Sequence, residues 1–161
     1  MNNISVIGKF KRLDVLEEVK EVERYHSLVD IDQYCLQTVD GEQDPLYGSR
    51  GGDEIAIGDT EKDFVHPLFD MPYTNKLIKK YNLYRTRIMK LPVKFCLTWH
   101  KDPTSRIHFP LLSNDDFFFI IEDEMVRMKM EDVVYKMNTT KFHTAVNAST
   151  ETRVHMIGTV L

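Results

Sequence analysis

The sequence predicts a mainly β fold, a double-stranded β-helix of the jelly-roll or cupin-like barrel type with a few peripheral N-terminal helices. Two observations support this prediction. From Tyr84 onward, short apolar-rich runs follow one another. Turn signals such as Pro103, Asn138 and the Asn114-Asp115 pair separate these runs, as expected between short strands. So dense a series of strands is typical of a sandwich or barrel, and a jelly roll fits its length best.

The length indicates a single domain, since 161 residues is an ordinary domain size. We expect residues 84–161 to form the barrel core and residues 1–83 to form a helical and loop-rich part that packs on it. The predicted strands are 84–91, 93–100, 105–112, 116–121, 124–130, 132–137, 141–147 and 152–160.

The first half contains two segments with helical spacing of apolar residues. An amphipathic helix is predicted over 13–24, and a second helix over 74–82 with Thr74 as its cap. The stretch 40–63, rich in glycine and acidic residues, is either a functional lid or a set of turns. The helical residues expected to face inward are Leu13, Leu16, Val19, Val22, Leu77, Ile78 and Tyr81.

Composition narrows the class of protein. The chain is 42% hydrophobic and 29% charged, which is ordinary for a soluble globular protein and argues against disorder. Its net charge of −4 provides no global attraction to nucleic acid or anionic lipid, so we expect neither as a partner.

Two cysteines outside any Cys-x-x-Cys pair disfavour structural zinc and fit a reducing compartment. The N-terminus has no signal-peptide pattern and no run is long enough to span a bilayer, so we expect a cytoplasmic protein. The oligomeric state stays open.

The predicted strands sort their polar residues by face, because side chains alternate with period two. His100 shares a face with Asp102, and Arg106 with His108. His143 shares a face with Asn147, and Arg153 with His155. A buried polar cluster is costly unless it binds something, so convergence on one pocket is the economical interpretation. Apolar residues near these sets, expected to pack in the core, are Cys96, Trp99, Met125, Met128, Met130 and Met137.

Three of these residues suit a metal site. His100 and Asp102 are two residues apart, and His143 can supply a third ligand from a later strand. Two histidines and one carboxylate on one face of the metal form the ligand set of non-haem Fe(II) oxygenases. Arg153 follows ten residues after His143, and we expect a hairpin turn at 147–150 to bring its strand back beside that of His143. An arginine fork suits a carboxylate, because it donates two parallel hydrogen bonds.

The stretch from Arg87 to the C-terminus resembles the aspartyl/asparaginyl β-hydroxylase family, which includes free-proline hydroxylases. The resemblance implies a double-stranded β-helix, Fe(II) as cofactor and 2-oxoglutarate as co-substrate. It implies that Arg153 holds the distal carboxylate of the co-substrate, and that Arg106 and His108 line its pocket or orient its other end. One departure is Glu131-Asp132, where the family usually has a glycine-containing turn. The matching pieces are His100-Lys-Asp102, Arg106-Ile-His108-Phe, His143-Thr-Ala-Val-Asn147 and Arg153-Val-His155.

The leading hypothesis is therefore an Fe(II)- and 2-oxoglutarate-dependent dioxygenase that hydroxylates an amino acid or a peptidyl side chain. A cupin-like metal-binding barrel with another activity or a binding role is the alternative, and a metal-free β-sandwich scaffold is a third reading. Candidate substrate contacts are Arg87, Asn147 and His155. His108 and His155 could equally be core histidines, and Asn147 could simply end its strand in a turn. The sequence does not distinguish a small-molecule substrate from a peptide.

Overall fold

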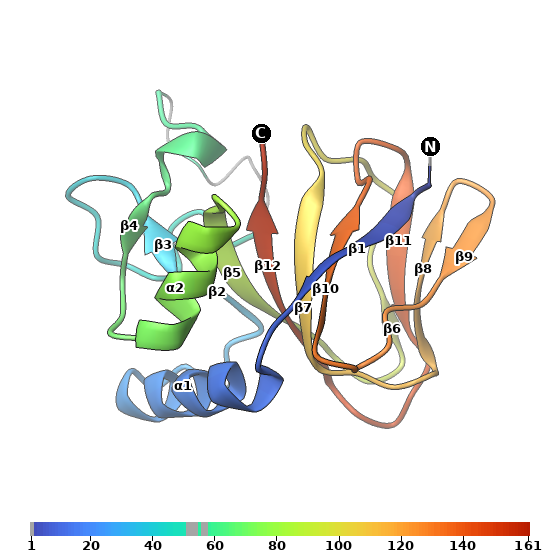
Figure 1. The fold of residues 1–161 in the computed structure, drawn as a ribbon, viewed down its shortest axis with the longest axis horizontal. Helices are drawn as coiled ribbons and strands as arrows, with labels where there is room; N and C mark the ends of the chain where they lie inside the picture. The colour runs from blue at the N-terminus through green and yellow to red at the C-terminus, as the bar shows by residue number, and fades with distance from the viewer. Residues whose placement is uncertain (1, 51–54, 56–57) are drawn as a thin grey trace.

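The computed structural model describes residues 2–50, 55 and 58–161, and it is a jelly-roll-like β sandwich, as the sequence predicts. A six-stranded sheet has the order β1-β10-β7-β12-β5-β2, and a four-stranded sheet has the order β6-β11-β8-β9 (Figure 1). All pairings within these two sheets are antiparallel. The strands of the large sheet are β1 (Ile4–Lys9), β2 (Gln33–Cys35), β5 (Tyr84–Leu91), β7 (Arg106–Leu112), β10 (Val133–Met137) and β12 (Arg153–Thr159). Those of the small sheet are β6 (Phe95–Cys96), β8 (Phe117–Ile121), β9 (Glu124–Val126) and β11 (His143–Asn147).

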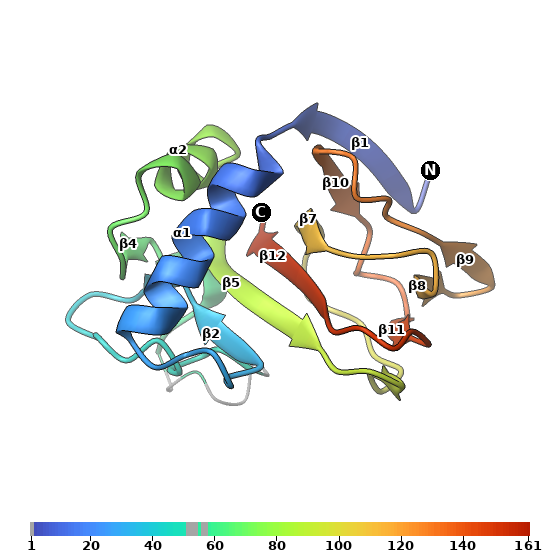
Figure 2. The same ribbon diagram turned by 90° about the horizontal axis from the view of Figure 1, so that it is seen from below.

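The large sheet is covered on both faces. Helices α1 (Arg12–Tyr25) and α2 (Pro72–Lys80) lie over one face, beside β5 and β12 (Figure 2). Ile107 and Phe109 of β7 and Met156 of β12 pack against these helices, while Arg106 and His108 alternate onto the face toward the small sheet. The alternation of β7 and β12 thus places an apolar layer under the helices and a polar layer inside the sandwich. A short sheet of β3 (Gln37–Thr38) and β4 (His66–Pro67) and the 3-10 helix η2 (Glu61–Asp63) complete the described elements.

The N-terminal part also contains two strands of the large sheet that the sequence did not predict. β1 pairs with β10, and β2 pairs with β5. β1 is largely exposed and β2 is only three residues long, so neither has the strong alternation that predicts a strand. Their pairing with distant strands decides their conformation, as is common for edge strands.

The predicted helices are present, with two corrections. Leu13 of α1 is 64% exposed and faces solvent, whereas Leu16 is buried. Thr74 is not a cap, since α2 begins at Pro72 and Thr74 lies buried inside it. The carboxylate of Glu18 on α1 accepts the N–H groups of Tyr73 and Thr74 at 2.8 and 2.9 Å, so another helix caps α2.

Residues 93–100 form much less strand than predicted, because only Phe95–Cys96 and an isolated bridge between His100 and His143 are regular. Trp99 and Cys96 are exposed, not in the core, and Trp99 stacks on the ring of Phe142 instead. Strand β9 ends at Val126, whereas the sequence predicts a strand over 124–130. The methionines near this strand therefore do not all lie in the core. Met128 and Met137 are buried as predicted, whereas Met125 and Met130 are exposed.

The expected hairpin between the strands of His143 and Arg153 is wrong. β11 belongs to the small sheet and β12 to the large one, where β12 lies between β5 and β7. The side chain of Asn147 organises the crossing, since its amide donates to the carbonyls of Leu91 and Glu151 at 2.9 and 2.8 Å. The two strands therefore belong to opposite sheets, and Arg153 and His155 of β12 contact Phe117 of β8 across the sandwich.

The described part of the 40–63 stretch forms turns and η2, and residues 51–54 and 56–57 lie outside the described residues. Asp132, where the family usually has a glycine-containing turn, has a φ of +55°. Aspartate adopts this left-handed conformation more readily than most residues, so the departure leaves the turn intact. Over the part of the chain that the structure describes, no helix combines the length and apolar character that crossing a bilayer requires.

Candidate metal centre and its cavity

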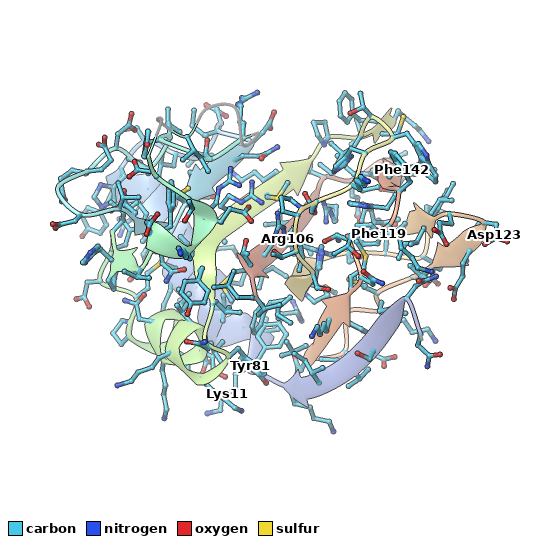
Figure 3. All side chains as sticks on the ribbon, turned by 90° about the horizontal axis from the view of Figure 1, so that it is seen from above. Lys11, Tyr81, Arg106, Phe119, Asp123 and Phe142 are labelled. Carbon is cyan, nitrogen blue, oxygen red and sulfur yellow. The ribbon has the colours of Figure 1, made fainter. Side chains whose placement is uncertain are left out.

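A cavity of about 700 Å³ lies between the two sheets, at the end where β7 and β12 carry their polar layer. In Figure 3, Arg106 lies near the centre of the molecule, and Phe119 and Phe142 lie toward the small sheet. The wall combines apolar surface from Phe119, Met137 and Ala145 with many charged side chains. A partly apolar cleft with a few convergent polar groups is the usual form of a small-molecule site.

The three predicted metal ligands converge at this cavity. His100, Asp102 and His143 each offer one ligand atom, and these atoms all lie within 4.8 Å of one another. Nε2 of His143 is 3.9 Å from a carboxylate oxygen of Asp102. The backbone places them: His100 and His143 exchange two hydrogen bonds of 3.1 and 2.7 Å, and the Asp102 N–H donates to the Thr139 carbonyl at 2.8 Å.

Both histidines are oriented for metal binding through Nε2. Nδ1 of His100 lies 2.6 Å from the Thr98 carbonyl oxygen, and Nδ1 of His143 lies 2.9 Å from that of Lys141. A carbonyl can only accept, so in the neutral imidazole each Nδ1 carries the proton and each Nε2 keeps its lone pair. Burial lowers the pKa of His143 below its usual value, which favours the neutral imidazole that binds metals. The donor set fits a divalent transition metal.

Arg153 is a buried cation with an incomplete set of partners. Its side chain is 3% exposed, and Cζ lies 4.4 Å from the centre of the Phe117 ring. Within the described residues, Nε and Nη1 have no hydrogen-bond partner. Burial lowers the pKa of Arg153 to about 9, which expresses the cost of holding this charge away from water. Such a group fits an anionic ligand, as the resemblance implies.

Two buried histidines lie next to Arg153. Nδ1 of His108 and Nδ1 of His155 are 3.3 Å apart, and neither Nε2 has a partner within the described parts of the chain. Burial lowers the pKa of both well below the usual value, and the charge of Arg153 lowers them further. Both are therefore neutral at pH 7. His108 lines the cavity, whereas His155 lies behind the wall, against the rings of Phe117 and Phe119.

The remaining candidates differ in position. Arg87 lines the cavity, where Nη1 donates to the carbonyls of Ser49 and Arg50, and its Nε has no partner among the residues described. Burial, and then the neighbouring Arg85 and Arg106, lower the pKa of Arg87 to about 10. Asn147 is not brought to the cavity. Its oxygen accepts from Ser149, and its amide holds the crossing turn.

Sequence reasoning missed one residue of the site, Glu61 of η2. Its carboxylate lines the cavity and binds Arg106 at 2.9 and 3.2 Å and Arg85 at 2.6 Å. Arg106 is in turn 3.3 Å from the nearer oxygen of Asp102, so it is already paired with two carboxylates. The only signal for Glu61 was its place in the acidic 40–63 stretch, where no periodicity separates it from its neighbours.

A family model of aspartyl/asparaginyl β-hydroxylases matches residues 18–161, which include every candidate residue above. No curated protein matches the chain. The family is one of hydroxylases, so at this level the protein is an enzyme of the oxygenase type. The match confirms the family resemblance read from the sequence, and the chain belongs to the aspartyl/asparaginyl β-hydroxylase family.

Proposed function

We propose that the protein is an Fe(II)- and 2-oxoglutarate-dependent dioxygenase that hydroxylates an amino acid or a peptidyl side chain. The proposal rests on one observation, which is that two features line the same cavity. One is a cluster of two histidines and one carboxylate, and the other is the buried, incompletely paired guanidinium of Arg153.

The ligand cluster suits Fe(II) by its chemistry. Two imidazoles and one carboxylate would supply three ligands to the metal, and this is the ligand set of non-haem Fe(II) oxygenases. The backbone carbonyls of Thr98 and Lys141 hold the two imidazoles in the required tautomer. Bound iron would supply the one-electron and dioxygen chemistry that no side chain provides.

The co-substrate is inferred from Arg153. A dicarboxylate such as 2-oxoglutarate brings a carboxylate that the guanidinium can bind through two parallel hydrogen bonds. That pairing offsets the cost of burying the cation, which is otherwise stabilised by the faces of Phe117 and Phe119. His108 and Arg106 line the same cavity, which supports a role for them in lining the pocket of the co-substrate. A cupin-like metal site without an oxoacid co-substrate leaves Arg153 without a role.

The chain's own residues would also control the environment of the reaction. Phe119, Met137 and Ala145 present apolar surface to the cavity and limit the water beside the bound molecules. Arg87 lies on the same cavity and offers a donor to a polar group of the substrate. These features suit a small molecule or a peptide segment, and we propose neither nucleic acid nor membrane lipid as a partner.

The test is an anaerobic Fe(II) titration of wild type and of His143→Ala, followed by 2-oxoglutarate turnover in the presence of each free amino acid. His143→Ala is expected to abolish iron binding and turnover. His66→Ala is the matched control, because His66 is exposed on β4 and should leave both unchanged. Full iron affinity in His143→Ala would refute the ligand assignment. Iron binding without any 2-oxoglutarate binding would favour the cupin-like alternative.

A further inference from the structure

The carboxylate of Glu61 connects the 40–63 stretch to the candidate metal centre, and the proposed function gives it no role. Its side chain is 16% exposed, although it belongs to a 3-10 helix of only three residues. Thr60 and Asp63 form a capping box around η2, with bonds of 2.7 and 2.8 Å that fix this short segment. A carboxylate this buried is stable only when it is paired.

On one side, Glu61 holds Arg106. Both of its oxygens accept from the guanidinium, at 2.9 and 3.2 Å, and the hydroxyl of Thr104 accepts a third bond at 2.7 Å. Nη2 of Arg106 lies 2.9 Å from Glu61 and 3.3 Å from Oδ1 of Asp102. The other oxygen of Asp102 is the one that lies toward Nε2 of His143. Arg106 therefore lies at one oxygen of Asp102, and the other oxygen points toward the candidate metal site.

On the other side, Glu61 is anchored by Arg85. Nη1 of Arg85 donates to Glu61 at 2.6 Å, and its Nε and Nη2 donate to the carbonyl of Gly48 at 2.8 and 2.6 Å. Arg85 has a φ of +44°, and the register of β5 on β12 shifts beside it. A β-bulge re-aims a side chain, and a non-glycine residue in the left-handed region persists only where its surroundings hold it. The strained backbone thus directs Arg85 onto Glu61.

We infer that Glu61 is a positioning residue for the metal ligand Asp102, acting through Arg106 with Arg85 as its anchor. The inference rests on the metal-dependent function proposed above. Replacing Glu61 by glutamine should lower the affinity for the metal in two ways. One negative charge near the cation disappears, and Arg106, released from Glu61, pairs more closely with Asp102 and withdraws its charge from the metal. Both effects weaken metal binding.

The test is the affinity of the full-length protein for Co²⁺ in the absence of co-substrate, followed through the visible absorption of the bound ion. Co²⁺ serves as the probe because it generally binds a given nitrogen and oxygen site more tightly than Fe²⁺. Glu61→Gln is expected to weaken Co²⁺ binding by about tenfold, the lower end for groups that orient metal ligands. In an Asp102→Ala background the same substitution should cost about twofold or less, because the group through which Glu61 acts is gone.

Glu23→Gln is the matched control. Glu23 is 13% exposed and paired with Lys90 at 2.8 Å, but it lies on α1, away from the cavity, so its loss should leave Co²⁺ affinity unchanged. If circular dichroism shows that Glu61→Gln does not fold, Glu61→Asp keeps the charge, withdraws the carboxylate by one methylene and should also lose affinity.

Unchanged affinity in the Glu61 variant would overturn the inference. So would an equal loss with and without Asp102, which would mean that Glu61 acts only as a distant charge. Wild-type protein that fails to bind Co²⁺, or His143→Ala protein that binds it normally, would instead overturn the proposed function, and the inference with it.

Discussion

At the scale of single residues, the site combines groups whose protonation and orientation are set by their immediate neighbours. The imidazoles of His100 and His143 are held by backbone carbonyls two residues before each of them in the chain, at Thr98 and Lys141. Both contacts are local, because each joins residues only two apart in the chain. Arg153 differs, because its environment comes from Phe117 and Phe119 on the facing sheet.

Arg153→Ala should leave metal binding largely intact and impair 2-oxoglutarate binding. The substitution leaves a buried carboxylate without its partner, a loss of roughly 3–5 kcal/mol. At about 1.4 kcal/mol per decade, the affinity falls by about two to three and a half orders of magnitude. Arg153→Lys should recover only part, because an ammonium cannot form the bidentate fork. The measurement is anaerobic 2-oxoglutarate titration with iron present.

Arg127→Ala is the control for this prediction. Arg127 is exposed and lies over the ring of Phe118. The side chain of Phe118 points to the opposite face of β8 from that of Phe117. The Arg127→Ala variant should therefore bind 2-oxoglutarate as the wild-type protein does. Unchanged affinity in Arg153→Ala would assign the carboxylate clamp to Arg106 or Arg87 and would weaken the dioxygenase proposal.

At the scale of elements, helix α1 supports the site indirectly. It buries Val15, Leu16, Val19 and Val22 against the outer face of the large sheet, whose inner face carries Arg106, His108 and Arg153. The strands that carry the polar side chains on their inner face are therefore supported on their outer face by apolar packing against α1. α1 also supplies Glu18 as the cap of α2, so the two helices form one cover.

Leu16→Ala should destabilise the protein by about 2–3 kcal/mol, since it removes a buried leucine and leaves a cavity under the helix. Leu13→Ala, three residues earlier on the same helix, should change stability by less than about 0.5 kcal/mol, because Leu13 is 64% exposed. Urea unfolding followed by circular dichroism compares the two free energies of unfolding. Equal losses at both positions would contradict the orientation of α1 described above.

At the scale of the whole molecule, the sandwich encloses ionisable groups that only the folded chain can keep from water. We expect residues 1–161 to unfold as one domain, because strands from the N-terminal part belong to the same sheet as those of the barrel core. His108 and His155 are the groups whose burial most clearly depends on this closure, since both sheets contribute to their surroundings.

The free energy of unfolding should fall as the pH is lowered below about 6.5, the value for an unfolded histidine. In the folded protein the pKa of His108 and of His155 is well below the usual value, so only the unfolded state takes up protons in this range. Each histidine then lowers stability by about 1.4 kcal/mol per pH unit, whereas above pH 7 both are neutral in both states and contribute no slope.

Urea unfolding at pH values between 5 and 8 checks this expectation. His155→Phe, which places an apolar ring among Phe117 and Phe119, should remove about half of the slope below pH 6.5. Stability that is independent of pH between 7 and 5 would show that these histidines are not buried in the neutral form.

The sequence by itself determined which side chains share a face. Alternation in β7, β11 and β12 and the spacing of His100 and Asp102 were sufficient to predict that the candidate metal ligands and Arg153 lie on one cavity, because strand periodicity is a local property of the backbone. It also determined the jelly-roll class and the existence of both helices. The family match over residues 18–161 agrees with these local patterns.

Only the tertiary structure decided which elements are neighbours. It placed β12 in the other sheet from β11 instead of beside it, made edge strands of residues 4–9 and 33–35, and turned Leu13 outward. It also connected Arg85 of a bulge and Glu61 of η2, through Arg106, to the candidate metal ligand Asp102. These arrangements depend on contacts between residues far apart in the chain. Local periodicity specifies the face of an element, but burial and charge pairing across the whole fold specify what that face meets.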